Sequence, residues 1–448
     1  MPRAGAAVKS ESQGQFVHPH RSGTRPATPI SAFMAVLLAT LGSGCAPSSP
    51  QTVSATPTAT TTAPRTGGAT PAAPPSWHVV SGATTGDDGL SLSGVTCPGI
   101  HDCWAVGLGF DGSADTAVIE HYTGESWSIV PAGIPSPTPG PGGTLLSAVT
   151  CATTSDCWAV GSQYPSSAGQ ALIEHYAGSG WSAVPTPTPS GPVDSRLDSV
   201  TCVSPSDCWA VGVTSNYGNG INQGLVEGLV EQYTGGGWSI VASPTPGPGT
   251  GNSLSSVTCV SADDCWAVGV TNNYGNGANK GFVQGLVEQY TGGGWTVVTS
   301  PPLSGGTGSG LSAVACVSAV DCWAVGSTMS DANGDSQGLI ERYAGNAWSI
   351  VVSPALSPSV GLLGVTCTDA DSCWSAGDYS PANPETFEEF LPLMERYAGG
   401  AWDVFAAPAL SGEGASLASV TCIDADACWA VGHVTVNESG QALIEQFS

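Results

Sequence analysis

The sequence predicts an all-β fold, a seven-bladed β-propeller with four-stranded blades. Three observations lead to this prediction: seven copies of a Cys-x5-Cys-Trp motif, four short apolar segments in each copy, and a second Trp that recurs once per copy. The first cysteines of successive copies are 54, 51, 57, 57, 51 and 55 residues apart. A period in this range indicates a repeat architecture.

Each copy contains four segments that have the character of β-strands. In the second copy they are residues 145–151, 157–161, 171–176 and 181–184, and each is rich in Val, Ile, Trp or Tyr and bounded by Gly, Pro, Ser or Asp. Such runs are typical of strands, and no stretch has helical periodicity over a useful length. Four strands in about 53 residues, repeated around an axis, make a propeller blade.

The tryptophans predict how the ring closes. Seven of the 14 follow the second cysteine of a copy, and the other seven begin its fourth strand. One fourth-strand segment, residues 77–80, precedes the first cysteine pair, whereas the last copy stops at Phe447 and Ser448 without one. We therefore expect the N-terminal strand to complete the last blade, which leaves no open sheet edge. The propeller is predicted to span residues 77–448.

The first 44 residues have the composition of an export signal. A polar stretch carrying Arg3, Lys9, Arg21 and Arg25 precedes an uncharged run at residues 30–44, which is too short to span a membrane. The run ends at Leu41-Gly42-Ser43-Gly44-Cys45, which resembles the lipobox of bacterial lipoproteins, although Gly42 stands where that motif usually has Leu. Cys45 is also the one cysteine left over from the seven pairs, so we expect it to be lipidated. The alternative is ordinary secretion with Cys45 incidental.

Composition defines a tether and excludes some partners. Residues 45–76 are mostly Ser, Thr, Pro and Ala, which predicts a disordered segment between the anchor and the folded domain. From Cys45 onward, 5 Lys and Arg face 34 Asp and Glu, a net charge of −29. This charge repels nucleic acid and anionic lipid, so we expect contact with a membrane only through an N-terminal lipid. We expect the chain to be a monomer.

The repeated pattern L-x-x-V-x-C-x5-C-x-A-V-G followed by L-I-E-x-Y-x-G-x-x-W-S-x-V resembles a group of exported bacterial repeat proteins, described as kelch-like or sialidase-like propellers. The resemblance covers residues 77–447. It implies the propeller architecture and brings no assigned reaction, so no catalytic residue is carried over.

The paired cysteines predict seven local disulfides between the first and second strands of each blade, because the pairing is strict and the context is that of an exported protein. Metal ligation is the alternative, but the spacing is not that of zinc sites and no histidine partner recurs. The fourteen cysteines are Cys97, Cys103, Cys151, Cys157, Cys202, Cys208, Cys259, Cys265, Cys316, Cys322, Cys367, Cys373, Cys422 and Cys428.

Three further positions repeat with the blades. An Asp stands before the second cysteine in five copies and one place earlier in two, and we interpret it as a turn former that bonds its own loop amides. A Glu recurs in the third strand and is predicted to accept hydrogen bonds from the backbone or from indole N–H groups. The residue after this Glu varies among His, Gln and Arg, which suggests a solvated edge.

The variable loops between second and third strands, together with the crossings between blades, are where we expect a ligand site. Blades three and four share an insertion whose Tyr, Asn and Gly residues could stack on a sugar or peptide and hydrogen-bond to it, although plain turn chemistry is the alternative. The predicted ligand-binding residues are Asn216, Tyr217 and Asn219, their counterparts Asn273, Tyr274 and Asn276, and Tyr164 and Tyr379 in other blades.

A weak calcium motif lies in the blade-five loop. Asp331, Asn333 and Asp335 resemble the opening of a calcium loop, but Ser336 replaces the expected Gly and no Glu stands at position twelve. Apart from this possible calcium, we expect no cofactor.

Three functions remain open on the sequence alone. The first is a non-catalytic propeller outside the membrane that binds a glycan or an extracellular protein. The second is an extracellular carbohydrate-active enzyme, for which a carboxylate pair is the one surviving mechanism, because the chain has few arginines and no Ser-hydrolase motif. The third is a structural or assembly scaffold. The fold alone does not distinguish these functions, and we favour the non-catalytic binding propeller.

Overall fold

The computed structural model describes residues 75–83, 89–110, 114–134, 143–165, 168–189, 193–216, 226–247, 250–273, 283–303, 308–329, 336–354, 359–381, 390–408, 410, 414–437 and 439–448. They belong to one compact unit, Ala72–Ser448. Within this unit the described residues form 28 strands, and none of them lies in a helix long and apolar enough to cross a membrane.

The strands fall into four classes by their place in the repeat, and the letters a to d denote the first to the fourth strand. The a strands are β2 (Ser91–Gly99), β6 (Thr144–Thr153), β10 (Val193–Ser204), β14 (Thr250–Ser261), β18 (Gly308–Ser318), β22 (Ser359–Asp369) and β26 (Gly414–Asp424). The b strands are β3 (Asp102–Phe110), β7 (Asp156–Gln163), β11 (Asp207–Asn216), β15 (Asp264–Asn273), β19 (Asp321–Met329), β23 (Ser372–Ser380) and β27 (Ala427–Val436). The c strands are β4 (Asp115–Tyr122), β8 (Gln170–Tyr176), β12 (Val226–Tyr233), β16 (Val283–Tyr290), β20 (Ser336–Tyr343), β24 (Leu391–Ala398) and β28 (Ser439–Phe447). The d strands are β5 (Trp127–Val130), β9 (Trp181–Val184), β13 (Trp238–Val241), β17 (Trp295–Val298), β21 (Trp348–Val351), β25 (Ala401–Phe405) and β1 (Trp77–Val80).

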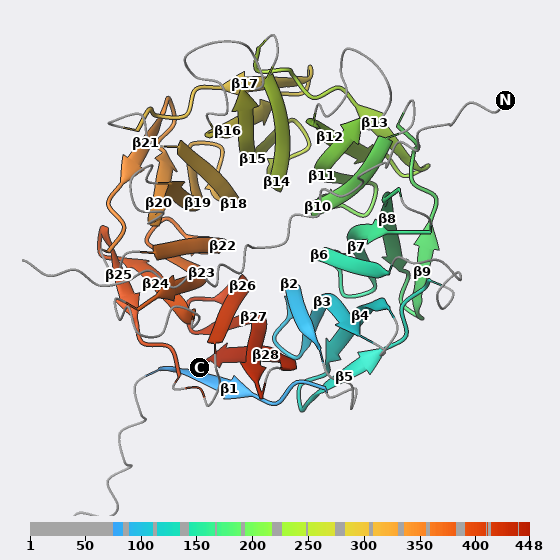
Figure 1. Ribbon diagram of the computed structural model, residues 1–448, viewed down its shortest axis with the longest axis vertical. Helices are drawn as coiled ribbons and strands as arrows, with labels where there is room; N and C mark the ends of the chain where they lie inside the picture. Colours follow the sequence, from blue (N-terminus) through green and yellow to red (C-terminus); the bar gives the residue numbers. More distant parts are fainter. Residues whose placement is uncertain are drawn as a thin grey trace, which may run out of the picture. The chain divides into compact units, whose positions relative to one another are not determined.

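The strands pair as antiparallel four-stranded blades, as the repeat predicts. Five blades are separate sheets, and the two formed by β18–β21 and β22–β25 are joined by a single parallel contact between Ser336 and Ser359. The last sheet runs β1-β28-β27-β26, so the N-terminal strand pairs with β28, with Trp77 opposite Phe447. Within the unit the blades surround a common axis, with the a strands innermost (Figure 1).

The expected strands of the second copy are all present, and the structure extends most of them by one or two residues. The segment expected at residues 145–151 is β6, Thr144–Thr153, and that at 157–161 is β7, Asp156–Gln163. The d strand β9, Trp181–Val184, has the expected bounds. The extensions follow from hairpin geometry, because the polar residues beside the turns continue the ladder between Thr153 and Asp156.

A glycine in each b strand lies opposite a bulge in the a strand. In the third blade the register shifts between Leu197 and Ser199, and Gly212 pairs with Leu197. A Cβ atom on Gly212 would lie 2.1 Å from the carbonyl oxygen of Arg196, so no larger residue fits without moving the backbone. The glycine of the repeat is therefore required by close approach of the two strands.

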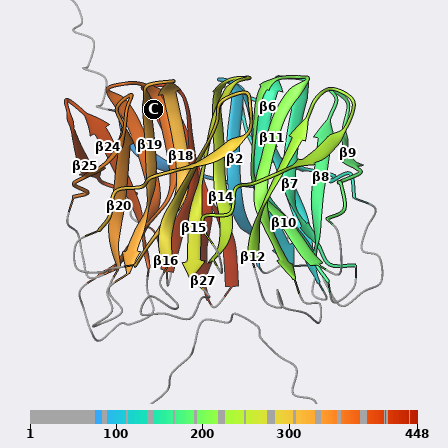
Figure 2. The ribbon, with the colours of Figure 1, turned by 90° about the horizontal axis from the view of Figure 1, so that it is seen from above.

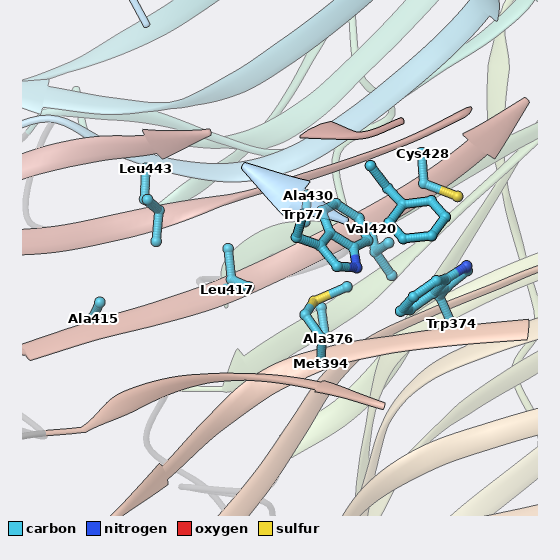
Figure 3. Packing of buried hydrophobic residues seen from close by; sticks show 11 residues of the cluster. Trp77, Trp374, Ala376, Met394, Ala415, Leu417, Val420, Cys428, Ala430 and Leu443 are labelled. Carbon is cyan, nitrogen blue, oxygen red and sulfur yellow. The ribbon is translucent and has the colours of Figure 1, made fainter. Parts of the chain in front are cut away.

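Neighbouring blades are joined by pairs of tryptophans. The Trp after each second cysteine packs edge-on against the d-strand Trp of the adjoining blade, with ring centroids 5.3 or 5.4 Å apart. Figure 3 shows the pair formed by Trp77 and Trp374. The same contact joins Trp429 of the last sheet to Trp127 of the first. The remaining pairs are Trp158–Trp238, Trp209–Trp295, Trp266–Trp348, Trp323–Trp402 and Trp104–Trp181.

Seven disulfides close the turns between a and b strands, as the cysteine spacing predicts. Each links two cysteines six positions apart whose Cα atoms are about 4 Å apart. In every pair the second cysteine is fully buried within a blade-to-blade core. Seven disulfides are compatible with an oxidising, extracellular compartment.

Candidate functional site

The folded unit has two faces with different chemistry. The a–b turns, closed by the disulfides, lie at the same end of the blades as the c–d turns, and we call this end the turn face. The b–c loops and the crossings between blades lie at the other end, the loop face. Figure 2 shows the strands running between the two ends, with the C-terminal end of β28 on the turn face. The expected ligand site belongs to the loop face.

Two cavities open between adjacent blades on the loop face, and each contains one of the predicted tyrosines. The first, which we call the Tyr379 pocket, has a volume of about 420 Å³. Tyr379, Leu391 and Phe405 of one blade line it together with Leu410 of the crossing and Val434 of the next blade. Its lining is mostly aliphatic and aromatic, which is the composition of a pocket that binds by contact area.

The second cavity, the Tyr164 pocket, lies between the first two cysteine-containing blades and has a volume of about 470 Å³. Tyr164, a residue that is 36% exposed, lines it together with Pro131, Ile134 and Asp115. The backbone N–H of Tyr164 donates a 3.0 Å hydrogen bond to the carbonyl of Gly143, which fixes the end of β7 against the crossing that precedes its blade. Asp115, Thr116, Thr144 and Gln163 add polar groups to this lining, so its surface is more polar than that of the first pocket.

Of the other sequence-predicted ligand-binding residues, the structure describes the backbone of two. Asn216 ends β11 and Asn273 ends β15, so their backbones belong to the loop face. Tyr217, Asn219, Tyr274 and Asn276 lie outside the described residues. The same holds for the calcium residues Asp331, Asn333 and Asp335, and for Cys45. Among the residues that the structure describes, no cluster of three or more His, Cys, Asp or Glu is placed to hold a metal.

A polar trio beside the Tyr379 pocket was missed by sequence reasoning. The Ser416 hydroxyl donates a 2.6 Å hydrogen bond to Asp378, and His433 lies opposite Ser416 in the ladder. Burial raises the pKa of Asp378 and lowers the pKa of His433. The sequence does contain a sign of this trio. The residue after the b-strand glycine is Leu or Val in three other blades, but it is Asp378 in one of these two blades and His433 in the other.

The repeated third-strand glutamates form a buried set. All seven are at most 1% exposed. Burial raises the pKa of Glu231 to about 8, raises five others to about 7, and raises that of Glu174 as well. The five are Glu120, Glu288, Glu341, Glu395 and Glu445.

Five of these glutamates accept a hydrogen bond from the crossing that enters their own blade. For Glu120 and Glu174 the donor is a backbone N–H, that of Ala83 at 3.0 Å and that of Gly133 at 2.9 Å. For the other three the donor is a serine hydroxyl: Ser243 to Glu288 at 3.1 Å, Ser300 to Glu341 at 2.9 Å and Ser353 to Glu395 at 3.1 Å. The carboxyl group therefore connects each of these blades to the crossing from the previous one.

In three blades a proline explains why the donor to the buried Glu is a serine hydroxyl. The backbone donors Ala83 and Gly133 stand six residues after a d-strand Trp, and the three serines stand five residues after one, each followed by Pro. In these three blades the proline has no N–H to donate, and the hydroxyl before it donates instead. Thr186, at the same place before Pro187, donates to the Ala171 carbonyl, and both carboxyl oxygens of Glu231 have no partner among the described residues. Glu445 has neither donor, because its crossing has Ala407 followed by Pro408, and both of its carboxyl oxygens are buried without a partner among the described residues.

The prediction that Trp indole N–H groups donate hydrogen bonds to the buried glutamates is wrong. The buried Nε1 atoms of Trp104, Trp158 and Trp209, and of most other described tryptophans, have no hydrogen-bond partner among the described residues. The Trp indoles are instead held by edge-on ring contacts. The expected bond from the backbone is found for Glu120 and Glu174.

A serine added at position 407 should stabilise the fold. We expect Ala407→Ser to give Glu445 the hydroxyl donor that Ser300 gives Glu341, and to raise the unfolding free energy by about 1 kcal/mol. Ser300→Ala removes the corresponding donor to Glu341 and should lower the unfolding free energy by about the same amount. Denaturant unfolding at pH 6 measures both. Equal stability of the two variants and the parent chain would contradict this account.

The repeated Asp of the a–b turn does not act as we expected. In five blades its carboxylate accepts a hydrogen bond from the side chain that follows the buried Glu, for example Arg342 to Asp321 at 2.9 Å and Gln289 to Asp264 at 3.2 Å. His121 and His175 make the same contact with Asp102 and Asp156 at 2.7 and 3.1 Å. In these blades the Asp therefore bonds to a side chain of the c strand and not, as predicted, to amides of its own loop.

The position after the buried Glu is likewise more than a solvated edge. His121 stacks on Trp104 with centroids 3.7 Å apart, and the guanidinium carbon of Arg342 lies 4.7 Å from the centroid of Trp323. These side chains are half-buried because each covers the indole of its own blade.

Comparison with solved structures shows a β-propeller-like fold. No family model matches the chain, and no curated protein matches it. A polysaccharide lyase of the PL25 family, an ulvan lyase bound to -[GlcA(1-4)Rha3S]-, superposes with a TM-score of 0.54 at 11% identity, covering 82% of this chain and 95% of its own. A second structure of a PL25 ulvan lyase gives 0.51 at 12% identity over 77% and 89%. YCF48 bound to D1 peptide gives 0.49 at 12% identity over 83% and 96%. At these identities the two lyase structures establish likeness in fold alone.

Proposed function

We propose that this chain is an exported binding module without catalytic activity, which recognises a glycan or an extracellular protein through the pockets of its loop face. In this proposal residues 1–44 are an export signal, Cys45 carries a lipid, and residues 45–76 are a tether. Residues 77–448 form a seven-bladed ring, closed by β1. The pairing of β1 with β28 and the packing of Trp429 on Trp127 support the closure.

The Tyr379 pocket is the observation that carries the proposal. A cavity of about 420 Å³ is in the range of sites that hold a sugar ring or a large side chain. Tyr379 and Phe405 offer rigid aromatic surface at low conformational cost, and Leu391 and Leu410 offer apolar contact. Such anchors contribute most of the affinity at binding surfaces. Their place between rigid blades means that little order has to be gained on binding.

Binding assays with three sets of variants test the proposal. The oxidised chain is screened against a glycan array and against extracellular proteins of the source cell surface. We expect Tyr379→Ala to weaken binding of the strongest hit at least tenfold, because a truncated aromatic anchor commonly costs 2 kcal/mol or more, roughly a 30-fold change in Kd. Tyr164→Ala and the pair Tyr217→Ala/Tyr274→Ala are the matched controls. Each variant must keep the parent melting temperature.

The outcomes separate the alternatives. Loss of binding in Tyr164→Ala alone would assign the site to the other pocket, and loss in the double variant alone would assign it to the insertions. Turnover of a bound glycan would replace the binding module with a carbohydrate-active enzyme. Unchanged affinity in every variant would refute a loop-face site.

A further inference from the structure

The guanidinium of Arg342 has polar partners on each of its three nitrogen atoms. Its Nε and Nη2 atoms donate to the two carboxylate oxygens of Asp321, both at 2.9 Å. Its Nη1 atom donates to the hydroxyl of Tyr397 in the next blade at 3.1 Å. The guanidinium also covers the face of Trp323. One carboxylate, one phenol and one indole thus satisfy this cation.

Arg396 occupies the same position one blade later but lacks both polar partners. Ser372 stands before the second cysteine where the preceding blade has Asp321, and Phe447 replaces the phenol of Tyr397. The stacking is kept, because the guanidinium carbon lies 5.1 Å from the centroid of Trp374 and 5.7 Å from that of Phe447. The arginine is therefore held in place by aromatic rings. The carboxylate across from it in the ladder is that of Asp403, which stands opposite Arg396 where the preceding blade has Ser349, and no ion pair between the two is found among the described residues.

Two buried polar atoms mark the place of the missing carboxylate. The Nε atom of Arg396 and the Oγ atom of Ser372 are both buried, and neither has a hydrogen-bond partner among the described residues. A buried donor without an acceptor costs free energy that an incoming acceptor recovers. A carboxylate is the acceptor that matches the fork of a guanidinium.

We propose that Arg396 and Ser372 form a binding site for the carboxylate group of a ligand, which takes the place that an aspartate side chain fills in five other blades. The carboxylate accepts from the guanidinium and from the Ser372 hydroxyl. The chain carries a net charge of −26, which repels polyanions, so the ligand is a small molecule with one carboxylate on a neutral body. The site lies on the turn face and is independent of the loop-face pockets.

Titration of the arginine side-chain signals tests this directly. Beyond the tether the chain has three arginines, Arg196, Arg342 and Arg396, so their Nε–Hε signals can be assigned by single substitutions in the ¹⁵N-labelled, oxidised chain. We expect sodium acetate to shift the Arg396 signal saturably, with a Kd on the order of 1–10 mM for so small a ligand. The signal of Arg342, already paired, should not move. Glucuronate and N-acetylglycine then separate a sugar acid from an amino-acid carboxylate, with neutral glucose as the control.

Ser372→Asp is the decisive variant. It restores the carboxylate found in the other blades, so it should weaken the acetate response of Arg396 at least tenfold while keeping the chain folded. Two carboxylates of the chain are local rivals: Asp371 is exposed in the same turn, and Asp403 stands opposite Arg396 in the β24–β25 ladder. If the Arg396 signal responds to acetate only in Asp371→Asn or only in Asp403→Asn, the parent chain fills the site itself and the proposal is wrong. A response matched by sodium chloride at equal ionic strength, or no response, would also overturn it.

Discussion

The folded unit should lose stability as the pH rises from about 5 to about 8. The seven buried glutamates have pKa values raised by burial, to about 7 for five of them and about 8 for Glu231, against 4.5 when they are exposed. A carboxyl whose folded pKa is raised stabilises the fold fully below its unfolded pKa and ceases to do so as the pH passes through the folded pKa. The contribution is therefore complete near pH 4.5 and is lost between pH 4.5 and 8.

The size of the effect follows from the shift. A rise from 4.5 to about 7 corresponds to about 3 kcal/mol for one carboxyl that must ionise in the fold. Seven such groups act in the same direction. His433, whose pKa burial lowers, acts the other way, because its folded state loses stability as the pH falls. We expect the melting temperature to fall by at least about 5 °C between pH 5 and pH 8.

Calorimetry from pH 4.5 to 8.5 checks the prediction. The double variant Glu231→Gln/Glu445→Gln removes two carboxyls that have no partner among the described residues, so it should melt higher than the parent chain at pH 8 and show a flatter pH profile. Glu125→Gln/Glu227→Gln, at two exposed positions, is the matched control for loss of two charges. A melting temperature that stays constant or rises from pH 5 to pH 8 would contradict the buried state of the glutamates.

Reduction of the disulfides should have the second large effect. Each disulfide closes a loop of six-residue separation and contributes about 2 kcal/mol in the chain-entropy model. Seven of them contribute about 14 kcal/mol together, which is comparable with the whole stability of a typical folded domain. We expect the reduced and alkylated chain to be unfolded, or to melt at least about 15 °C lower.

Thermal unfolding of oxidised and alkylated samples, with alkylated cysteines counted by mass spectrometry, measures this. The variant Cys259→Ser/Cys265→Ser tests one blade, and its expected loss of about 2 kcal/mol should equal that of Cys151→Ser/Cys157→Ser in another blade. A fully alkylated chain that melts near the parent temperature would show that the hydrophobic core suffices without them.

The periodic features could be predicted from the sequence because each depends on neighbours along the chain. Strand positions follow from alternating apolar runs and turn residues, and the cysteine pairs follow from a fixed local spacing. The Trp-x-x-Val segments read as d strands for the same reason, and β9 has the expected bounds. The match of residues 77–80 to the strand missing from the last copy also rests on counting alone.

Relations between blades could not be predicted in the same way. The donor to Glu341 is Ser300, 41 residues earlier in the chain, and no local pattern connects them. The Asp–Arg contact between Asp321 and Arg342 depends on the b–c register, which sets Trp323 opposite Arg342. The Tyr379 pocket collects side chains from five strands, and only its tyrosine belongs to the expected set. Packing in three dimensions decides these features.

A crystal structure with the strongest ligand from the binding screen tests the central claim most directly. The claim is that a pocket between blades on the loop face is the recognition site. We expect the ligand to lie against Tyr379, Leu391 and Phe405, with the d–a crossing at Pro408 in contact with it. A ligand bound at full occupancy elsewhere, with the Tyr379 and Tyr164 pockets both empty, would contradict the claim.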